Sequence, residues 1–376
     1  MHTSRITTGA LGGLALALLT TFAQAAGNDI VIGQTIALTG GQAEHGRAVQ
    51  LGARAYLDKV NAAGGVHGRR ILLTTLDDAG NAAKAAENTA LLIDRENALA
   101  VFGGIEGGPC VASMRVASEK RVPLVACLAG SPEMREPFNR YVFPVRAAHY
   151  SEFERLIDLS IESGGRKIGF LHSDSETGRK HLANVRKLLA RYKLDVAAAI
   201  AIPNDKPDAK KIADQIVAGK LDVVFNHGSY ALYGEIVKEM KTRGADTRFM
   251  AVNSGAQQMA RTLGKDAHGI IFTQVVPFPW AATPPVVAEH KAALKAAAPT
   301  AEPSFSSLEG FISAKVLVAG LQRASARLSR EDLVAGLEQL GNHDVGGFGV
   351  VYGPASRTGS TLVDTVLATG TGRFVR

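Results

Sequence analysis

Residues 30–75 read IVIGQTIALTGGQAEHGRAVQLGARAYLDKVNAAGGVHGRRILLTT, and they predict a strand, a helix and a second strand in that order. The run 30–36 is rich in β-branched residues, as buried strands are. Six small or apolar residues then fall on one helix face: Val49, Gly52, Ala53, Tyr56, Leu57 and Val60. The pair Gly64-Gly65 is typical of a helix end, and the run 71–75 follows as the next strand.

The same alternation of strand and helix continues to about residue 275. Further strands of the first half are expected at 99–102, 124–127 and 141–145. In the second half they are expected at 167–171, 196–202, 222–225, 248–252 and 270–274. Strands that alternate with helices of ten or more residues predict parallel sheets with helices on both faces.

We therefore predict an α/β fold of two doubly wound parallel-sheet lobes, joined by a multi-strand hinge with a ligand cleft between them. The first lobe is expected to comprise residues 27–147 plus 277–343, and the second residues 148–276 plus 344–376. Prolines interrupt the alternation where the chain returns to the first lobe, at 277, 279, 284 and 285. The apolar runs 348–352 and 362–367 of the tail are expected to form a hairpin.

The first 25 residues have the pattern of a secretory signal peptide. Arg5 precedes an apolar run at 9–19, and the small residues of Ala23-Gln24-Ala25 stand before Ala26. The run is short for a membrane span of about 20 residues, and a buried N-terminal helix is the less favoured alternative. Because no cysteine follows the cleavage point, we expect a soluble protein of the periplasm.

Composition narrows the classes of partner. The chain has a formal charge of +7, but its basic residues occur as scattered doublets such as Arg69-Arg70 and Lys210-Lys211. A nucleic-acid partner would favour one basic stripe with aromatic residues between the charges, so none is expected. The chain has no second long apolar run, so no membrane span is predicted. A monomer is expected because two lobes must move freely.

Cys110 and Cys127 are the two cysteines of the chain. In an oxidising compartment an even pair is a disulfide candidate, because one residue begins a helix and the other ends the next strand. Two buried free thiols are the alternative. A metal site at either cysteine is not expected, since no histidine or acid lies at ligand spacing from them.

Two glycine-rich loops follow neighbouring strands of the first half. Residues 103–109 contain Gly107 and Gly108 ahead of a helix, and residues 127–133 contain Ala129, Gly130 and Ser131. Such loops let backbone N–H groups approach a ligand, and a helix N-terminus favours an anion. A plain tight turn is the alternative. A nucleotide loop is not expected, because the Walker Lys-Ser/Thr pair and the dinucleotide-binding spacing are both absent.

Residues 172–178, HSDSETG, occupy the equivalent place in the second half. A hydrolase could use Ser, His and Asp, but no nucleophile elbow is present and a helix cap accounts for the same residues. We therefore do not expect an enzyme.

The motifs IALTG at 36–40 with Gly46, NAAGGVHGR at 61–69, and Asp77-Asp78 resemble the branched-chain amino-acid (Leu/Ile/Val) binding-protein family. These are type I periplasmic binding proteins of ABC importers. The resemblance covers essentially the whole chain after the leader. It implies two lobes that close on a small ligand and deliver it to a membrane permease, with neither chemistry nor cofactor.

The ligand-binding positions of that family are changed here. Gly107 stands where the family has a Ser, Gly130 where it has a carboxylate-binding Thr, and Thr177 where it has an aromatic residue. The acid that holds an α-ammonium aligns near His149, and a Glu and a second aromatic become Asn253 and His45. The small N-terminal disulfide of the family is also absent, because its positions are Gly80 and Glu106.

These changes favour a small organic acid, an aromatic carboxylate or an amide over a standard α-amino acid, since a buried ammonium needs a counter-charge. A genuine amino-acid ligand, standard or modified, stays open if Glu106 supplies that charge, and so does a sensory module that reports to a membrane receptor. The predicted ligand site comprises His45, Glu106, Gly107, Gly108, Ala129, Gly130, Ser131, His149, Tyr150, Thr177, Ser229, Tyr230 and Asn253.

Several of these residues have a plainer interpretation. His45 and His149 are expected to be exposed, as isolated histidines usually are. Arg146 either pairs with a ligand carboxylate or lies at the surface of the hinge. Trp280 either stacks on the ligand or, more simply, packs within the protein.

Overall fold

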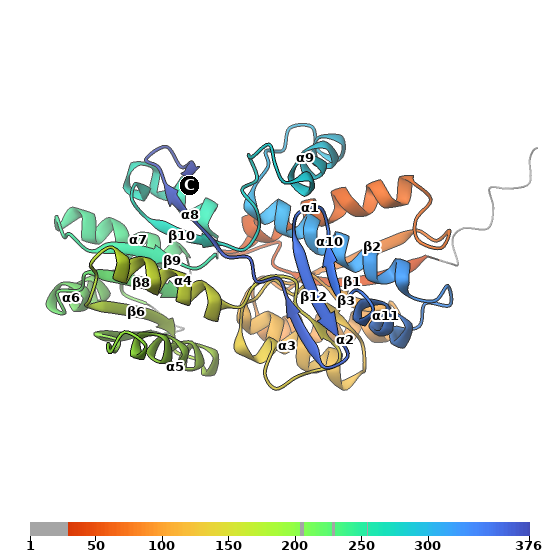
Figure 1. Cartoon of the computed structure of the whole chain (residues 1–376), viewed down its shortest axis with the longest axis horizontal. Helices are drawn as coiled ribbons and strands as arrows, with labels where there is room; N and C mark the ends of the chain where they lie inside the picture. The colour runs from red at the N-terminus through yellow and green to blue at the C-terminus, as the bar shows by residue number, and fades with distance from the viewer. Residues whose placement is uncertain (1–28, 204–206, 228–229, 254) are drawn as a thin grey trace, which may run out of the picture.

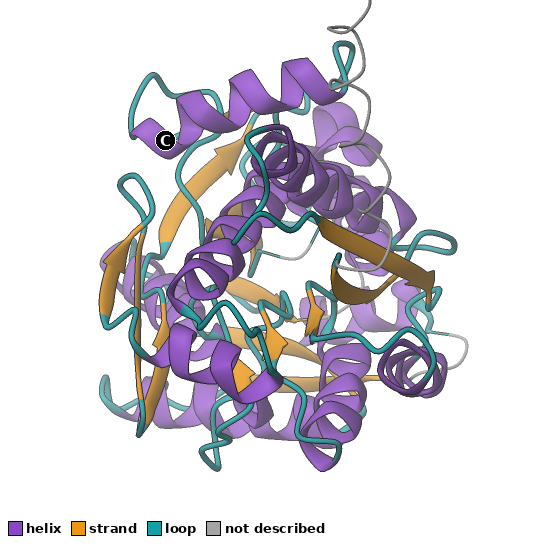
Figure 2. Cartoon of the chain, turned by 90° about the vertical axis from the view of Figure 1, so that its right-hand side faces the viewer, coloured by secondary structure: helices purple, strands orange, loops and turns teal. Residues whose placement is uncertain are grey.

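A computed structural model describes residues 29–203, 207–227, 230–253 and 255–376. They form two α/β lobes that lie side by side, with the first sheet at one end of the molecule and the second at the other (Figure 1). Seen from the end of the first lobe, helices lie around central strands, and further strands stand at the left edge of the view (Figure 2). The predicted signal peptide lies outside the described residues.

The first lobe is built on a parallel sheet with the strand order β2-β1-β3-β4-β5. Its strands are β1 (Ile30–Ile36), β2 (Ile71–Asp77), β3 (Ala100–Phe102), β4 (Leu124–Val125) and β5 (Val142–Phe143). Its helices are α1 (Ala43–Ala62), α2 (Ala82–Asp94), α3 (Gly107–Glu119), α9 (Pro285–Ala297), α10 (Phe305–Arg323) and α11 (Arg330–Glu338). The strand–helix–strand unit predicted for residues 30–75 is confirmed.

Helices α1 and α10 pack unusually closely because glycines lie at their contact. A Cβ on Gly52 would lie 1.8 Å from the backbone oxygen of Ser307, and one on Gly310 would lie 2.1 Å from that of Val49. At the end of α1, the Asn61 side chain exchanges two hydrogen bonds with the backbone of Ile71. This Asn fixes the turn between α1 and β2.

The second lobe is built on a seven-stranded sheet with the order β15-β14-β10-β9-β8-β6-β7. Its parallel part contains β6 (Ile168–Ser173), β7 (Ala198–Ile202), β8 (Val223–His227), β9 (Arg248–Ala251) and β10 (Ile271–Gln274). Strand β14 (Asp364–Ala368) pairs antiparallel with β10, and β15 (Phe374–Val375) pairs with β14. The helices are α4 (His149–Glu162), α5 (Glu176–Ala190), α6 (Ala209–Ala218), α7 (Tyr230–Thr242) and α8 (Ala256–Leu263).

The tail does not form the predicted hairpin, and that prediction is wrong. The run 348–352 enters β12 (Gly349–Gly353), which lies between β11 (Asn342–Asp344) and β13 (Ser356–Gly359) in a separate antiparallel sheet. The run 362–367 instead supplies β14, because the edge of β10 offers it a full row of backbone partners.

The small sheet belongs with the first lobe. The Tyr352 hydroxyl donates a hydrogen bond of 2.8 Å to the backbone oxygen of Pro144, and its ring lies edge-on to Phe143 at 5.5 Å. We therefore propose that the last crossing between the lobes lies near residue 360 rather than at 344. The chain then crosses three times, at 144–149, 275–285 and 360–364, as a multi-strand hinge would.

Among the described residues, none of the helices is both long and apolar enough to cross a lipid bilayer.

Candidate functional site

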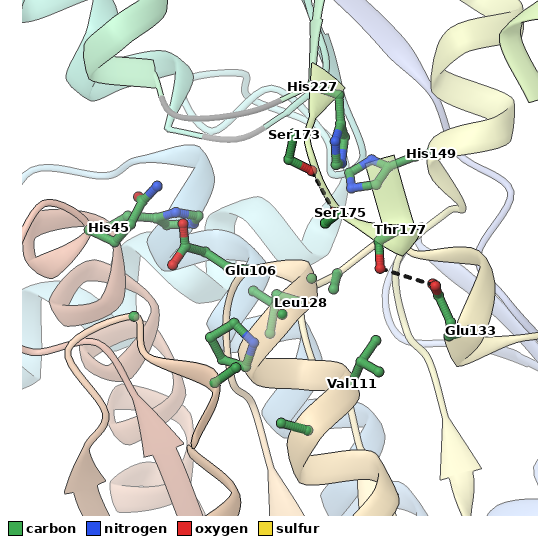
Figure 3. Close-up of a pocket in the computed structure, with 18 of the residues that line it drawn as sticks. His45, Glu106, Val111, Leu128, Glu133, His149, Ser173, Ser175, Thr177 and His227 are labelled. Carbon is green, nitrogen blue, oxygen red and sulfur yellow. Dashed lines mark hydrogen bonds between the residues drawn. The ribbon is translucent and has the colours of Figure 1, made fainter. Parts of the chain in front are cut away.

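A cleft of about 600 Å³ lies where strand ends of the two lobes meet. The first lobe contributes loops around residues 41–45, 79–82, 106–115 and 128–133. The second lobe contributes Ser173 at the end of β6, residues 175–177 at the start of α5, His227 at the end of β8, Ala231 and Asn253. In Figure 3, His149 and His227 lie together on one side of the pocket, and His45 and Glu106 lie together on the other. The expectation that strand ends line the site is met by this geometry.

The Asp-Asp pair shapes the wall of the cleft. The Asp77 carboxylate accepts hydrogen bonds from the backbone N–H groups of Leu38 (2.8 Å) and Ala79 (2.9 Å). The Asp78 carboxylate accepts from the N–H of Gly80 (2.9 Å) and the hydroxyl of Thr35 (3.0 Å). The two acids thus hold the loops that follow β1 and β2 against each other, and they do not face the ligand space themselves.

Helix N-termini converge on the cleft from both lobes. Helix α3 begins at Gly107 and α5 begins at Glu176, next to Thr177, and both starts line the cleft. Helix α4 begins at His149, which lines it as well. Helix N-termini carry partial positive charge and free N–H groups, so this arrangement favours an anionic group in the cleft.

Glu106 is the N-cap residue of α3 and has a backbone conformation that glycine usually adopts, with φ 66° and ψ 147°. Its carboxylate lies close to Gly80, where a Cβ would lie 2.9 Å from Oε2. Burial raises the pKa of Glu106 to about 7, and the nearby Asp78 adds to the rise while a hydrogen bond from Gln42 opposes it. Glu106 is therefore poised between its neutral and charged forms near neutral pH.

The expectation that His45 and His149 are exposed is wrong. Their exposed fractions are 7% and 6%, because both lie in the first turns of helices on opposite sides of the cleft between the lobes. Burial, together with the charge of Arg146, lowers the pKa of His45 to about 4. Burial also lowers the pKa of His149, against the opposing effect of Glu152. Both line the cleft as neutral imidazoles.

Arg146 lies in the hinge, and only 3% of its surface is exposed. Its guanidinium lies 3.0 Å from Oε2 of Glu152 in α4 and 3.6 Å from Oε1 of Glu309 in α10. The structure therefore shows a buried hinge residue rather than an exposed one, and its carboxylate partners come from the protein. Burial would raise the pKa of Glu152, but Arg146, His149 and Thr273 together lower it to about 2.

Asn253 completes this network. Its side-chain N–H group lies 3.3 Å from Oε2 of Glu309, and its backbone N–H donates to Oε1 of Glu152 at 2.9 Å. The hinge thus joins α4, α10 and the end of β9 through one arginine and two carboxylates. Sequence reasoning missed Glu152 and Glu309, although a Glu placed between Leu308 and Phe311 was a detectable signal.

A disulfide joins Cys110, in the first turn of α3, to Cys127, at the start of the second glycine-rich loop, and the two Cα atoms lie 5.8 Å apart. Of the two alternatives left open by the sequence, the structure has the bonded pair. Both residues are buried, and Gly104 lies against them. A Cβ on Gly104 would lie only 2.9 Å from Sγ of Cys127. The bond fixes the start of α3 to the end of β4.

Predicted residues of the second loop divide between the cleft and the layer behind it. Ala129 lines the cleft together with Gly107 and Gly108. Gly130 lies behind them, where a Cβ would lie 2.5 Å from the His149 ring. Ser131 is buried, and its hydroxyl lies 2.7 Å from where a Cβ on Gly107 would be.

The remaining predicted residues lie in several places. Thr177 lines the cleft and donates to Glu133 across the lobes at 3.0 Å. Tyr230 bridges the lobes at the rim, since its hydroxyl donates to the backbone oxygen of Gly41 at 2.6 Å. Tyr150 packs against the core of the second lobe, away from the cleft. Trp280 packs with Phe305 at 5.4 Å, as the plainer interpretation expects, and Ser229 lies outside the described residues.

Comparison with known proteins now identifies the frame. A family model described as "Periplasmic binding protein" matches residues 29–363. The chain belongs to the periplasmic binding protein family. A Leu/Ile/Val-binding protein homologue of Brucella melitensis is 27% identical over 324 residues, which cover 84% of this binding protein and 85% of the relative. An "Amino acid binding protein" of Pseudomonas aeruginosa is 26% identical, with 84% and 83% covered.

Solved structures agree with this assignment. A possible leucine/isoleucine/valine-binding protein from Rhodopirellula baltica superposes with a TM-score of 0.86 at 26% identity, covering 94% of this chain and 98% of its own. A substrate-binding periplasmic protein from Ralstonia solanacearum gives 0.85 at 28% identity, with 92% and 99% covered. The resemblance inferred from the sequence motifs is therefore confirmed, and so is the two-lobed fold.

Proposed function

We propose that this binding protein is the receptor of an ABC importer and that its ligand is a small organic acid, an aromatic carboxylate or an amide. The observation that carries the proposal is the state of the acids around the cleft. Three described lining residues are acidic, and none offers a carboxylate that is both ionised and unpaired. Glu106 has a raised pKa, Glu133 is engaged by Thr177 and Lys180, and Glu176 pairs with Lys180 at the surface.

An α-ammonium group held in such a cleft would lack a fixed counter-charge, which is costly in a desolvated site. A ligand carboxylate, in contrast, would meet the N-termini of α3 and α5 and neutral imidazoles on both walls. The volume of about 600 Å³ lies within the usual range for small-molecule sites.

Two solved proteins of the same fold support the chemical class without fixing it. One, from R. palustris, is a solute-binding protein in complex with benzoate, and it superposes with a TM-score of 0.77. Another, from Thermomonospora curvata, is described as a fatty acid transporter substrate-binding protein and gives 0.81. Each is only 18% identical to this chain. They illustrate that the same fold accepts acids without an α-amino group.

An amino-acid ligand is the second candidate, because relatives at 26–27% identity are named for amino acids and Glu106 lies in the cleft. The two candidates differ in how binding depends on pH. A carboxylate ligand prefers protonated Glu106, so its affinity falls as the pH rises through about 7. An ammonium ligand prefers ionised Glu106, so its affinity rises over the same interval.

The test begins with a native mass spectrum of the protein as purified, because a retained ligand reveals its class by mass. Ligand-stripped protein is then screened by thermal shift against benzoate-like acids, amides, leucine and valine, since a bound ligand raises the melting temperature. An acid or amide that binds, with affinity falling above pH 7, is the expected result. Tight binding of leucine or valine would overturn the proposed ligand class.

We further propose export to the periplasm with cleavage before Ala26, action as a monomer, and release of the ligand unchanged to a membrane permease. The mass of the N-terminal peptide of the exported protein tests the cleavage. Recovery of an unaltered ligand tests whether the protein releases it without a chemical reaction. A sensory role in place of transport would appear as a ligand response that survives deletion of the permease.

A further inference from the structure

Three histidines from three separate elements meet at the second-lobe wall of the cleft. His149 begins α4, His181 lies in α5, and His227 ends β8. One ring nitrogen from each lies within 4.8 Å of the others. The ring centres of His181 and His227 are 4.0 Å apart, and that of His149 lies 4.7 Å from His227 and 5.3 Å from His181.

The nitrogens of this cluster lack the partners that buried polar atoms need. His181 has no exposed surface, and neither of its ring nitrogens has a hydrogen-bond partner in the described chain. The Nδ1 atom of His227 is buried and equally without one. Buried polar atoms are normally paired, so an ion that binds one nitrogen of each ring would give a partner to atoms that have none in the described chain.

The surroundings match the environment of a metal ligand. Glu152 accepts a hydrogen bond from Nδ1 of His149 at 2.6 Å, which leaves Nε2 as the free nitrogen of that ring. A carboxylate behind a histidine is the usual second contact of a metal-bound imidazole, because it fixes the ring and raises its basicity. On the other side, Phe153 lies 5.5–6.2 Å from all three rings and keeps that side dry.

We propose that His149, His181 and His227 bind one divalent transition-metal ion, with Zn²⁺ the best suited. Three imidazoles fit the tetrahedral preference of Zn²⁺ and leave one position open. His149 and His227 both line the cleft, so the open position faces the ligand space. On the proposed function, a ligand carboxylate oxygen would occupy it. The ion would then supply a positive charge that, unlike that of Arg146, is not already paired with carboxylates of the hinge.

Metal content tests the site without any ligand. Tag-free protein is stripped with EDTA, titrated with Co²⁺ followed by visible absorption, and measured for bound Zn²⁺ by mass spectrometry. One equivalent per chain, with the strong absorption of tetrahedral Co²⁺ and a higher melting temperature in Zn²⁺, is expected. A wild-type protein that takes up no stoichiometric metal overturns the proposal, because the histidines then form only a packed neutral cluster.

Variants assign the binding to these residues. His181→Gln should weaken Co²⁺ binding by more than the roughly 10–100-fold that losing a hydrogen-bonded partner of a metal ligand costs. The matched control is His290→Gln, because His290 is also fully buried but lies in α9 and bonds Ser307 at 3.0 Å. It should keep one equivalent. If His181→Gln does not fold, the less buried His227→Asn replaces it, and equal metal uptake by variant and control contradicts the assignment.

Ligand binding with and without Zn²⁺ separates this inference from the proposed function. A ligand that binds equally well to stripped and loaded protein shows that the metal does not hold it, and the claim for the open position falls. Stoichiometric metal binding with no ligand among the acids and amides leaves the metal site standing and overturns the proposed ligand class instead.

Discussion

At the scale of single residues, function concentrates in side chains whose charge is set by burial. Glu106 and Arg146 both border the cleft, yet they are stabilised in opposite ways. Arg146 has two carboxylates around it, whereas Glu106 has a single hydrogen-bonded neighbour and another acid near it. Arg146 is therefore a fixed charge, whereas the charge of Glu106 varies with pH.

Glu106 should make stability depend on pH. Folding raises its pKa from 4.5 to about 7, so the folded protein holds this proton more tightly than the unfolded chain. Its favourable contribution is complete below pH 4.5 and is lost as the pH rises through 7. The rise corresponds to about 3 kcal/mol.

Glu106→Gln, which cannot ionise, should therefore be more stable than wild type by about 3 kcal/mol at about pH 8.5 and nearly equal to it at about pH 4.5. Urea unfolding at the two pH values measures the difference. An unchanged difference between the two conditions would show that Glu106 is solvated in the folded protein.

Arg146 should be indispensable to the hinge. Arg146→Met leaves Glu152 and Glu309 buried without their cation, and breaking a buried pair in this way costs about 3–5 kcal/mol. Arg261→Met is the control, because its pair with Glu44 is exposed and should be worth less than about 1 kcal/mol. Urea unfolding of both variants measures the contrast, and similar losses would mean that water reaches the hinge.

At the scale of elements, the sequence predicts what is local and misses what depends on distant partners. The strand–helix–strand unit and the glycine-rich loops were predictable because their periodicity and turn residues lie within short windows. The prediction for the tail failed because its second apolar run pairs with β10, about ninety residues earlier in the chain, and not with the first apolar run of the tail. His181 and His227 were missed because no spacing rule connects residues from α5, β8 and α4.

The contact between α1 and α10 gives a prediction about packing. Gly52→Ala places a Cβ 1.8 Å from the Ser307 backbone oxygen, so the helices must separate at a cost of about 1–3 kcal/mol. Gly234→Ala in α7 meets side-chain carbons of Leu263 only at an ordinary 3.8 Å, and should be neutral or stabilising by up to about 1 kcal/mol. The melting temperature of Gly52→Ala should therefore fall, whereas that of Gly234→Ala should equal or exceed the wild-type value.

The disulfide should stabilise both loops of the cleft. Removing a bond that closes a loop of this size, 17 residues in separation, costs about 3 kcal/mol in the chain-entropy description. Cys110→Ala with Cys127→Ala should lower the unfolding free energy by that order and weaken ligand binding. A reducing agent should reproduce the effect in wild type and leave the double variant unchanged, which is the control for the measurement.

At the scale of the whole molecule, the lobes touch on both sides of the cleft. Glu133 accepts from Thr177 and Lys180 at 3.0 and 3.1 Å on one side, and Tyr230 bonds Gly41 on the other. These contacts are formed between lobes that hinge motion would separate, so they favour the closed arrangement. The candidate site could therefore be placed at the lobe interface from the sequence. The contacts that hold the lobes together, which we call latches, could not be predicted.

Glu133→Ala should shift the protein towards an open form. Two contacts across the lobes are lost, which together are worth about 1 kcal/mol and about fivefold in ligand affinity. Glu176→Ala is the matched control, because Glu176 also pairs with Lys180 but lies in the same helix. Small-angle X-ray scattering of the ligand-free variants should show expansion only for Glu133→Ala, and equal radii of gyration would contradict the latch.

The position of β14 also bears on when the protein can mature. Between β10 and β14 the chain forms α9, α10, α11 and the small sheet of the first lobe, so β14 reaches the edge of β10 only after them. The sheet of the second lobe therefore stays incomplete until these segments have been synthesised. A chain that emerges from the ribosome in order thus cannot complete its second lobe before the later helices of its first lobe are available.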